Sequence, residues 1–308
     1  MARIALLVNK TSRVEDGNYL RFSRELCKLE HQVSLVFVDS LRFFSGQIKA
    51  HMVSWLPNLR PGSQFPKTTE CIVDHDVVWV LGFGNKSTFL DKYQLLYILS
   101  ESCKVINSLE TIMHLNSKYY TASEKAKFPS PETHASTCAD ELISFVKLNK
   151  GQWIVKPPAG SLGKDIYLTH AEDSQLTSII EGLCGPDNNN YTMIQRYVPE
   201  IEKGEKRVLL AGGKIMGQYV RFPKEDHRTN ITAGAKIEPC NLTEAELRFC
   251  NQLAQQVLLK GTWFAGVDLI YPWVIELNVI NPGGIKTIEE LTGCDLSSKV
   301  VAAVMSTL

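Results

Sequence analysis

The sequence predicts a chain of α/β and α+β class, with an N-terminal domain on a parallel sheet followed by a longer α+β region. Up to about residue 110, short buried strands alternate with helices, a rhythm typical of a parallel sheet covered on both faces. From about residue 117, strands that return on themselves are mixed with helices, which favours α+β. The length of 308 residues leaves room for two or three domains or lobes.

The N-terminal elements follow from local hydrophobic patterns. Apolar residues at helical spacing predict a helix over Asn18–Leu29. The other elements expected here are strands over Ile4–Val8, Gln32–Val38 and Val77–Gly82, a strand opening at Val105, and a helix over Phe89–Leu99. The interval Ser45–Thr69 is rich in Pro, Gly and Ser, so it predicts a long loop or excursion.

The second region carries turn and cap signals. Gly212-Gly213 joins two strand patterns into a hairpin, and Thr243 with Glu246 forms a capping box that begins a helix. Two apolar runs around Tyr271-Pro272 predict a buried hairpin. The remaining expected strands cover Glu132–Ala135, Trp153–Lys156, Asp165–Leu168, Tyr191–Tyr197, Val208–Ala211 and Ile215–Arg221. Three further helices are expected: one over Ala139–Leu148, one that follows the Asp165–Leu168 strand and ends at about Leu183, and one over Ser297–Met305.

Composition excludes several classes of protein. Lys plus Arg equal Asp plus Glu at 33 each, so no overall field favours nucleic acid or an anionic membrane as a partner. The eight cysteines include no C-x-x-C pair, which argues against zinc and thioredoxin-like chemistry and favours reduced thiols. No run approaches the length of a membrane span, and the N-terminus looks like a strand. We expect a soluble, cytoplasmic protein.

Three polar side chains of the C-terminal hairpin are candidate metal ligands. Glu276 and Asn278 are two residues apart on one strand, so they share a face, and pairing should bring Asp268 onto it. Two carboxylates and an amide converging in an apolar setting would repel each other without a cation. Oxygen ligands of this kind suit Mg²⁺ held together with nucleotide phosphates. The alternative is that these are the polar edges of an ordinary hairpin.

A candidate phosphate site surrounds the end of the strand that precedes Pro157. Lys156 ends an apolar strand, and a small-residue loop follows it that includes Gly160, Ser161 and Gly163. Small residues let backbone N–H groups approach phosphates, and Lys156 could neutralise them. The loop lacks the P-loop spacing and opens no helix, so a P-loop NTPase is excluded. A plain turn is the alternative interpretation.

A second segment offers what an adenosine site needs. The extended backbone of Gln195, Arg196, Tyr197 and Val198 can pair with an adenine edge, and Glu205 can accept ribose hydroxyls. The alternative is a strand end followed by a solvated acid.

The polar interval Pro223–Lys236 resembles a mobile lid. Arg207, Arg221 and Arg228 lie in or near it, and Asn230 adds an amide. Arginine favours bidentate contacts with carboxylate or phosphate groups, so the interval could close over reacting groups. We expect it to be mobile without ligands and ordered with nucleotide and substrate. An exposed loop with ordinary surface charges is the alternative.

One glycine-containing loop invites a dinucleotide interpretation. Gly82-Phe-Gly-Asn-Lys-Ser87 follows a strand and precedes a helix, but the G-x-G-x-x-G pattern is incomplete and no ribose-binding acid is evident. A nicotinamide oxidoreductase is therefore disfavoured. The carboxyl edge of a parallel sheet remains a suitable place for a substrate.

Taken in order, the motifs resemble the ATP-grasp superfamily, and most closely bacterial glutathione synthetase. The resemblance is carried by Gln195-Arg-Tyr-Val-Pro, Gly204-Glu-Lys-Arg-Val-Leu, Arg228-x-Asn230, Gly266-Val-Asp and Glu276-Leu-Asn-Val, with Asn116-Ser-Lys118 and Lys156-Pro upstream. It implies a pre-ATP-grasp substrate domain over residues 1–115 and an ATP-grasp domain of two lobes, over 116–198 and 199–308. The second lobe would carry the metal site and the lid.

The resemblance also implies roles for the candidate residues. Lys118, Lys156 and the loop after Lys156 would bind ATP phosphates, residues 195–198 the adenine and Glu205 the ribose. Asp268, Glu276 and Asn278 would hold Mg²⁺, with Mn²⁺ as the alternative ion. The arginines, together with Asn230, would face phosphate, acyl phosphate or substrate carboxylate.

The implied reaction joins a small carboxylate substrate to an amine, such as an amino acid or short peptide, and releases ADP and phosphate. A homo-oligomer is also implied. The rival interpretation is a non-catalytic ATP-binding regulator or scaffold with the same fold.

Two segments depart from the glutathione synthetase pattern. The family's Arg-Lys-Asp-Pro-Pro-type segment, which helps bind the dipeptide, is replaced by Leu81-Gly-Phe-Gly-Asn-Lys-Ser87. The Ser-Pro-Thr-type run after the metal-binding Asn is replaced by Asn281-Pro-Gly-Gly284. The nucleotide loop is also less glycine-dense than in the family. The substrate-facing parts therefore differ, and we expect the ATP-dependent chemistry to be kept while the substrate is left open.

Overall fold

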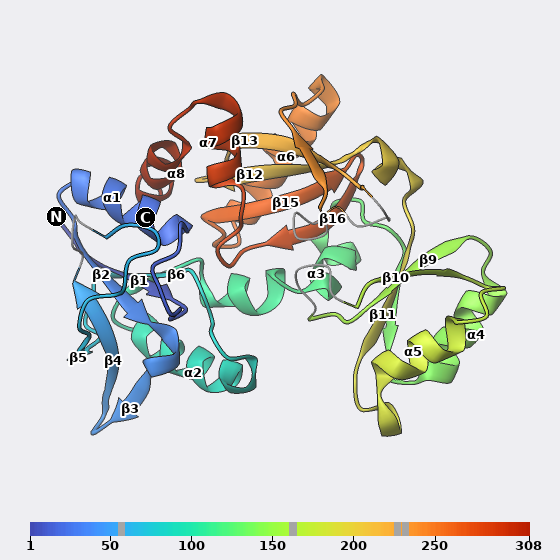
Figure 1. The fold of residues 1–308 in the computed structure, drawn as a ribbon, viewed down its shortest axis with the longest axis horizontal. Helices are drawn as coiled ribbons and strands as arrows, with labels where there is room; N and C mark the ends of the chain where they lie inside the picture. Colours follow the sequence, from blue (N-terminus) through green and yellow to red (C-terminus); the bar gives the residue numbers. More distant parts are fainter. Residues whose placement is uncertain (55–58, 160–164, 225–228, 230–233) are drawn as a thin grey trace.

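The computed structural model describes all 308 residues except 55–58, 160–164, 225–228 and 230–233. Its strands form three sheets, one of seven, one of four and one of five strands (Figure 1). In the described part of the chain, no helix is long and apolar enough to cross a membrane.

The N-terminal sheet has the parallel centre that the sequence predicts. Strands β1 (Arg3–Val8), β2 (Gln32–Phe37), β6 (Val77–Val80) and β7 (Lys104–Ile106) pair in parallel in the order β2-β1-β6-β7. Helices α1 (Asn18–Lys28) and α2 (Phe89–Ser100) form where their apolar spacing predicts them. The carboxyl ends of β2, β1 and β6 therefore meet at one edge of the sheet.

The prediction of a long loop over Ser45–Thr69 is wrong at its start. Residues Gln47–Ser54 form strand β4, which pairs antiparallel with β2, with β3 (Arg42–Phe44) and with β5 (Thr69–Ile72). Its side chains alternate between buried and half-buried along most of its length, the period-2 pattern of a strand. Gly46 lies directly before the strand, and the Pro residues and Gly62 lie after it, so composition averaged over the interval concealed the alternation.

The second sheet is antiparallel, in the order β10-β9-β11-β8. It comprises β8 (Thr133–Ser136), β9 (Gln152–Lys156), β10 (Tyr167–His170) and β11 (Thr192–Arg196), with helices α4 (Ala139–Leu148) and α5 (Leu176–Cys184). One hydrophobic cluster joins these helices to the sheet around the fully buried Trp153. The short helix α3 (Lys118–Ala122) precedes this lobe and contacts the last strand of the third sheet.

The third sheet is antiparallel and carries the predicted hairpins. Its order is β14-β13-β12-β15-β16, with bounds β12 (Glu205–Ala211), β13 (Lys214–Phe222), β14 (Lys236–Glu238), β15 (Phe264–Ile270) and β16 (Trp273–Asn278). Helix α6 (Glu244–Leu258) begins at Thr243, and the capping box with Glu246 is confirmed. In the described ranges there are also six short helical turns, at Val38–Ser40 (η1), Lys86–Thr88 (η2), Thr111–Leu115 (η3), Glu124–Ala126 (η4), Pro186–Asn188 (η5) and Pro199–Lys203 (η6).

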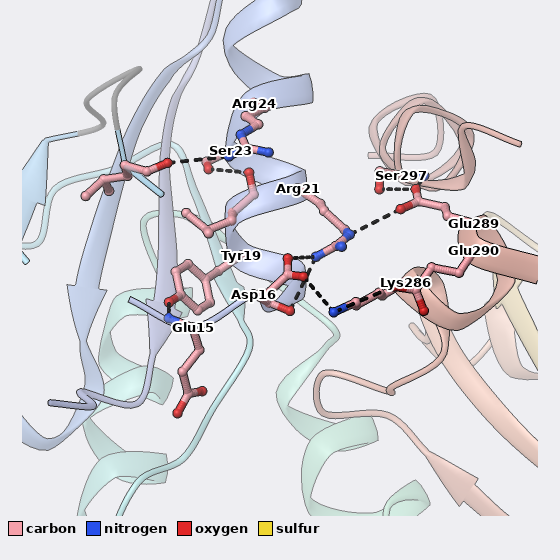
Figure 2. Close-up of polar contacts among 12 residues, drawn as sticks. Glu15, Asp16, Tyr19, Arg21, Ser23, Arg24, Lys286, Glu289, Glu290 and Ser297 are labelled. Atoms are coloured by element: carbon pink, nitrogen blue, oxygen red, sulfur yellow. Dashed lines mark hydrogen bonds and ion pairs between the residues drawn. The ribbon is translucent and has the colours of Figure 1, made fainter. Parts of the chain in front are cut away.

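The N-terminal domain and the C-terminal lobe are joined by a shared core and by ion pairs. Helix α8 (Leu296–Met305) packs against α1, and one hydrophobic cluster runs from β1 to α8. Helix α7 (Ile285–Thr292), which sequence patterns did not predict, faces α1 across a polar seam (Figure 2). There Arg21 binds Glu289 at 3.2 Å and Asp16 at 2.6 Å, and Lys286 binds Asp16 at 2.9 Å. Because the core is continuous, the boundary at residue 115 stays a prediction.

Candidate functional site

The register of the C-terminal hairpin brings the three candidate metal ligands together. Asp268 on β15 pairs directly with Glu276 on β16, and Gly266 pairs with Asn278. Directly paired residues point to one face of a sheet, and Asn278 lies on that face two residues beyond Glu276. The Asn278 amide nitrogen lies 3.4 Å from the Oδ2 atom of Asp268.

A buried network of four charged side chains lies on the same face. Arg207 makes a fork of two hydrogen bonds to Asp268, from Nε to Oδ1 at 2.6 Å and from Nη2 to Oδ2 at 3.0 Å. Arg221 donates to Asp268 Oδ1 at 2.7 Å and to Glu205 Oε2 at 2.6 Å. All four residues are at least 92% buried, with exposed fractions of 4% to 8%. The network follows from the sheet register, since Glu205 pairs with Arg221 and Arg207 with Asp268.

These contacts correct the premise that the hairpin carboxylates need a metal ion to offset their charge. Two guanidinium groups and two carboxylates balance in the network, and Lys118 neutralises Glu276. Burial alone would raise the pKa of the Asp268 carboxyl, but Arg207 and Arg221 hold it below its ordinary value. A divalent cation remains compatible with the oxygen donors. It would meet Glu276 first, and Asn278 would join with its amide oxygen turned toward the ion.

Glu205 is less accessible than a ribose-binding acid would be in an open site. Its Oε2 atom accepts hydrogen bonds from Arg221 and from the Thr229 hydroxyl. Burial, together with the charge of Asp268, raises the pKa of Glu205 despite the nearby Arg221. Its role toward ribose stays a prediction, and so do the roles of Arg207 and Arg221 toward phosphate or substrate. In this structure both arginines contact protein carboxylates, while the buried Nε of Arg221 has no partner among the described residues.

Two lysines from different elements face the hairpin and the neighbouring sheet. Lys118, at the start of α3, donates to Glu276 Oε1 at 2.8 Å. Lys156, at the end of β9, donates to the Gln195 side-chain oxygen at 2.8 Å and is 7% exposed. Burial, followed by repulsion from Lys118, lowers the pKa of Lys156 to about 8, although Glu276 and Glu205 oppose the shift. The arrangement brings two cations to one place between the lobes.

In the segment 195–198, the side chains of neighbouring residues point to opposite faces of the sheet. The Gln195 side chain lies with Lys156 and Thr133, whereas Arg196 covers the Trp153 ring at 3.8 Å and pairs with Glu132 at 3.0 Å. The backbone N–H groups of Arg196 and Tyr197 donate to the carbonyl groups of Glu132 and Gln152. The Val198 carbonyl accepts from the Ile201 N–H, and the pairing of this segment with an adenine edge stays a prediction.

Several predicted site residues lie outside the described part of the chain. They are Gly160, Ser161, Gly163, Arg228 and Asn230, and most of the predicted lid over Pro223–Lys236 lies outside it too. Among the described residues, no three His, Cys, Asp or Glu side chains gather in a way that could hold a metal ion. The metal site predicted here would combine two carboxylates with an amide.

Sequence patterns missed the groups that support the site. Thr133 accepts from the Gln195 amide at 2.9 Å, and Thr229 binds Glu205. Asn18 donates to the Asn281 side chain at 2.8 Å and to the Pro282 carbonyl at 3.0 Å. Each is a single polar residue without a local motif, and only the fold brings it near its partner.

Solved structures with a similar architecture include ATP-grasp ligases. One is a RiPP-associated ATP-grasp ligase of Chryseobacterium gregarium, solved in complex with ADP and a leader and core peptide. Its TM-score is 0.66 at 14% sequence identity, and the match covers 100% of this chain and 98% of that chain. A D-cycloserine synthetase has a TM-score of 0.64 and 12% identity, with 98% of both chains covered. At these identities the likeness shows the fold. The fold is thus the ATP-grasp fold.

The sequence comparisons narrow the class to a family. Residues 119–293 match the family described as prokaryotic glutathione synthetase, ATP-grasp domain. A glutathione synthetase of Synechocystis sp. is 30% identical over 326 residues, which cover 97% of this chain and 98% of that protein. One from Gloeobacter violaceus is 32% identical over 200 residues, or 64% of this chain and 60% of that protein. The chain belongs to the prokaryotic glutathione synthetase family, whose members are ATP-dependent carbon–nitrogen ligases that use ATP and a divalent metal ion.

Proposed function

We propose that the chain joins the carboxylate of a small amino acid or peptide to an amine through an acyl phosphate, and releases ADP and phosphate. The observation that carries the proposal is the meeting of Lys118 and Lys156 with Glu276 and the buried network around Asp268. Two cations beside a set of oxygen donors suit the triphosphate of ATP and its metal ion. A protein that only sensed ATP would need fewer of these groups.

The side chains have distinct tasks in this proposal. Lys118 and Lys156 bind the phosphates and offset the charge that develops during transfer to the carboxylate. Arg207 and Arg221 fix Asp268 and Glu205, so the wall of the site is already ordered when substrates arrive. Mg²⁺, held by Asp268, Glu276 and Asn278, would neutralise phosphate oxygens when bound. Mg²⁺ is preferred over Mn²⁺ because phosphates and a few carboxylates are its usual partners.

The substrates are proposed only as a class. Relatives named glutathione synthetase suggest γ-glutamylcysteine and glycine, but both substrate-facing segments differ in this chain. An ADP-release screen across amino acids and dipeptides, with γ-glutamylcysteine and glycine included, tests the proposal. We expect ADP release that requires one carboxylate and one amine together. ATP binding without substrate-dependent ADP release would favour the regulatory alternative.

We expect Glu276→Gln to weaken the apparent metal affinity by about 10- to 100-fold, by analogy with the loss of groups around metal sites. The amide keeps the size of the side chain but removes the charge that the cation would meet. Titrating Mg²⁺ in the ADP-release assay measures the effect, and Glu290→Gln on the exposed side of α7 is the control. Wild-type activity of Glu276→Gln at limiting Mg²⁺ would remove Glu276 from the proposed metal site.

We further propose that the enzyme works in the cytoplasm as a homo-oligomer. All eight cysteines are free thiols, which suits a reducing compartment that also supplies ATP. Size-exclusion chromatography with light scattering measures the oligomeric state.

A further inference from the structure

A row of three hydrogen bonds leads from the backbone to the buried Lys156. The Lys156 Nζ atom donates to the Gln195 side-chain oxygen at 2.8 Å, and the Gln195 side-chain nitrogen donates to the Thr133 hydroxyl at 2.9 Å. That hydroxyl donates in turn to the Pro131 carbonyl oxygen at 2.8 Å. The row therefore ends on a backbone group that lies just before β8.

The register of the four-stranded sheet builds this row. Thr133 on β8 pairs with Gln195 on β11, and Gln195 pairs with Ile154 on β9. Lys156 lies two residues beyond Ile154, so the three polar side chains share one face of the sheet. Helices α4 and α5 pack on the other face, around Trp153. The row thus lies on the face that is turned away from these helices.

The chemistry of the groups fixes the direction of each bond in the row. A carbonyl oxygen can only accept, so the Thr133 hydroxyl gives its one hydrogen to Pro131 and presents lone pairs to Gln195. The amide nitrogen of Gln195 donates to those lone pairs, and the amide oxygen is therefore turned toward Lys156. The reverse orientation would set an N–H group of the amide against the ammonium group of the lysine.

A fixed acceptor matters for Lys156 because its surroundings disfavour a charge. The side chain is 7% exposed, and burial followed by the charge of Lys118 on α3 lowers its pKa to about 8. Glu276 on β16 and Glu205 on β12 oppose that shift. A hydrogen bond to the charged form favours that form, so the Gln195 oxygen keeps a larger fraction of the lysine protonated.

We infer that Thr133 is a positioning residue for nucleotide binding, because it holds the Gln195 amide with its oxygen toward Lys156. The inference rests on the proposed role of Lys156 toward the phosphates of ATP. If the hydroxyl is lost, the amide nitrogen loses its acceptor and the amide can turn. A turned amide does not accept from Lys156, so a larger fraction of the lysine is neutral before the nucleotide arrives.

The test measures ADP binding and its proton uptake by calorimetry between pH 6 and pH 9, with Mg²⁺ present and in buffers of different ionisation enthalpy. We expect Thr133→Val to move the uptake about one pH unit lower, which corresponds to the loss of a hydrogen bond to a charged group. The Kd for ADP should then rise about fivefold at pH 8 and change little at pH 6, where the lysine is charged in both proteins. Thr133→Ser keeps the hydroxyl and should restore the wild-type behaviour.

A second variant should shift the proton uptake in the opposite direction. Gln195→Glu sets a carboxylate beside Lys156, which favours the charged lysine, so the uptake should move to higher pH. Thr192→Val is the matched control, since the Thr192 hydroxyl on β11 is buried in the same sheet and has no hydrogen-bond partner among the described residues. Its proton uptake and its Kd for ADP should match those of wild type.

The pH dependence separates a positioning role from a merely structural one. A loss of ADP affinity in Thr133→Val that is equal at pH 6 and pH 8 would show a structural role and overturn the inference. Unchanged binding at both pH values, or shifts of the same sign in Thr133→Val and Gln195→Glu, would overturn it as well. Should Thr133→Val not fold, Thr133→Ala takes its place with the same expected shift. The expected shifts in a protein that releases no ADP from ATP would support the inference while the proposed ligase function fails.

Discussion

Replacing Lys156 by Met should lower kcat/KM for ATP by about 100- to 1,000-fold, the usual effect of removing one preorganised group that meets developing charge. The lysine is buried at the end of β9, and its nearest partner is the neutral side chain of Gln195. A buried cation with a neutral partner is costly to the free protein and is stabilised when phosphates arrive. Methionine fills similar space without charge, so the fold should be kept and the melting temperature should not fall.

The pH dependence of nucleotide binding checks the same residue. With a pKa of about 8, Lys156 is mostly charged at pH 7 and mostly neutral at pH 9 in the free protein. Because phosphates favour the charged form, ADP binding should take up a proton near pH 8 to 9, and affinity should fall as pH rises through that range. Calorimetry in buffers of different ionisation enthalpy measures the uptake. Lys156→Met should show none, and equal uptake in wild type and variant would contradict the assignment.

Replacing Asp268 by Asn should lower the free energy of unfolding by about 3–5 kcal/mol, because it leaves buried guanidinium groups without their shared carboxylate. Among the acids that the structure describes, Glu205 alone would then remain in the network to offset the charges of Arg207 and Arg221. The pKa of Asp268 is lowered in the folded chain, so its contribution is complete above its ordinary pKa. That contribution is lost as pH falls through the folded value. Denaturant unfolding at pH 7 measures the change.

Two controls separate the network from general effects of charge. Glu244→Gln removes one partner of an exposed pair on α6, with side chains 71% and 91% exposed, and should change stability by less than about 1 kcal/mol. The double variant Arg207→Met with Asp268→Leu removes a whole pair and should cost less than Asp268→Asn alone. A loss below about 1 kcal/mol for Asp268→Asn would mean that the network does not stabilise the fold.

Local signals sufficed for many elements of the fold. The capping box at Thr243 and the helix over Ala139–Leu148 depend on neighbours within a few residues, and the structure has both. Helix α7 follows Asn281-Pro-Gly-Gly284, whose glycines obscured its start, and β4 was concealed by the composition of the residues after it. The average composition of an interval does not reveal a strand when the same interval also contains a loop.

The candidate site was predicted as a set of residues but not as a set of contacts. The spacing of Glu276 and Asn278 placed them on one face, as the strand register requires. The pairing of Asp268 with Arg207 depends on β12 lying beside β15, which are separated by more than 50 residues in the sequence. No local sequence pattern indicates that β12 and β15 are neighbours. The sequence therefore pointed to a metal ion alone as the source of the compensating charge.

The central claim, an acyl phosphate formed from a carboxylate and ATP, is tested most directly by isotope transfer. Once the ADP-release screen identifies a carboxylate substrate, that substrate is labelled with ¹⁸O in its reacting carboxyl group and incubated with ATP, Mg²⁺ and the amine. If the carboxylate attacks the γ-phosphorus and the amine then displaces phosphate, the released phosphate carries one ¹⁸O atom from the substrate. Unlabelled phosphate, released at the same rate as ADP, would show that water is the acceptor and would contradict the account.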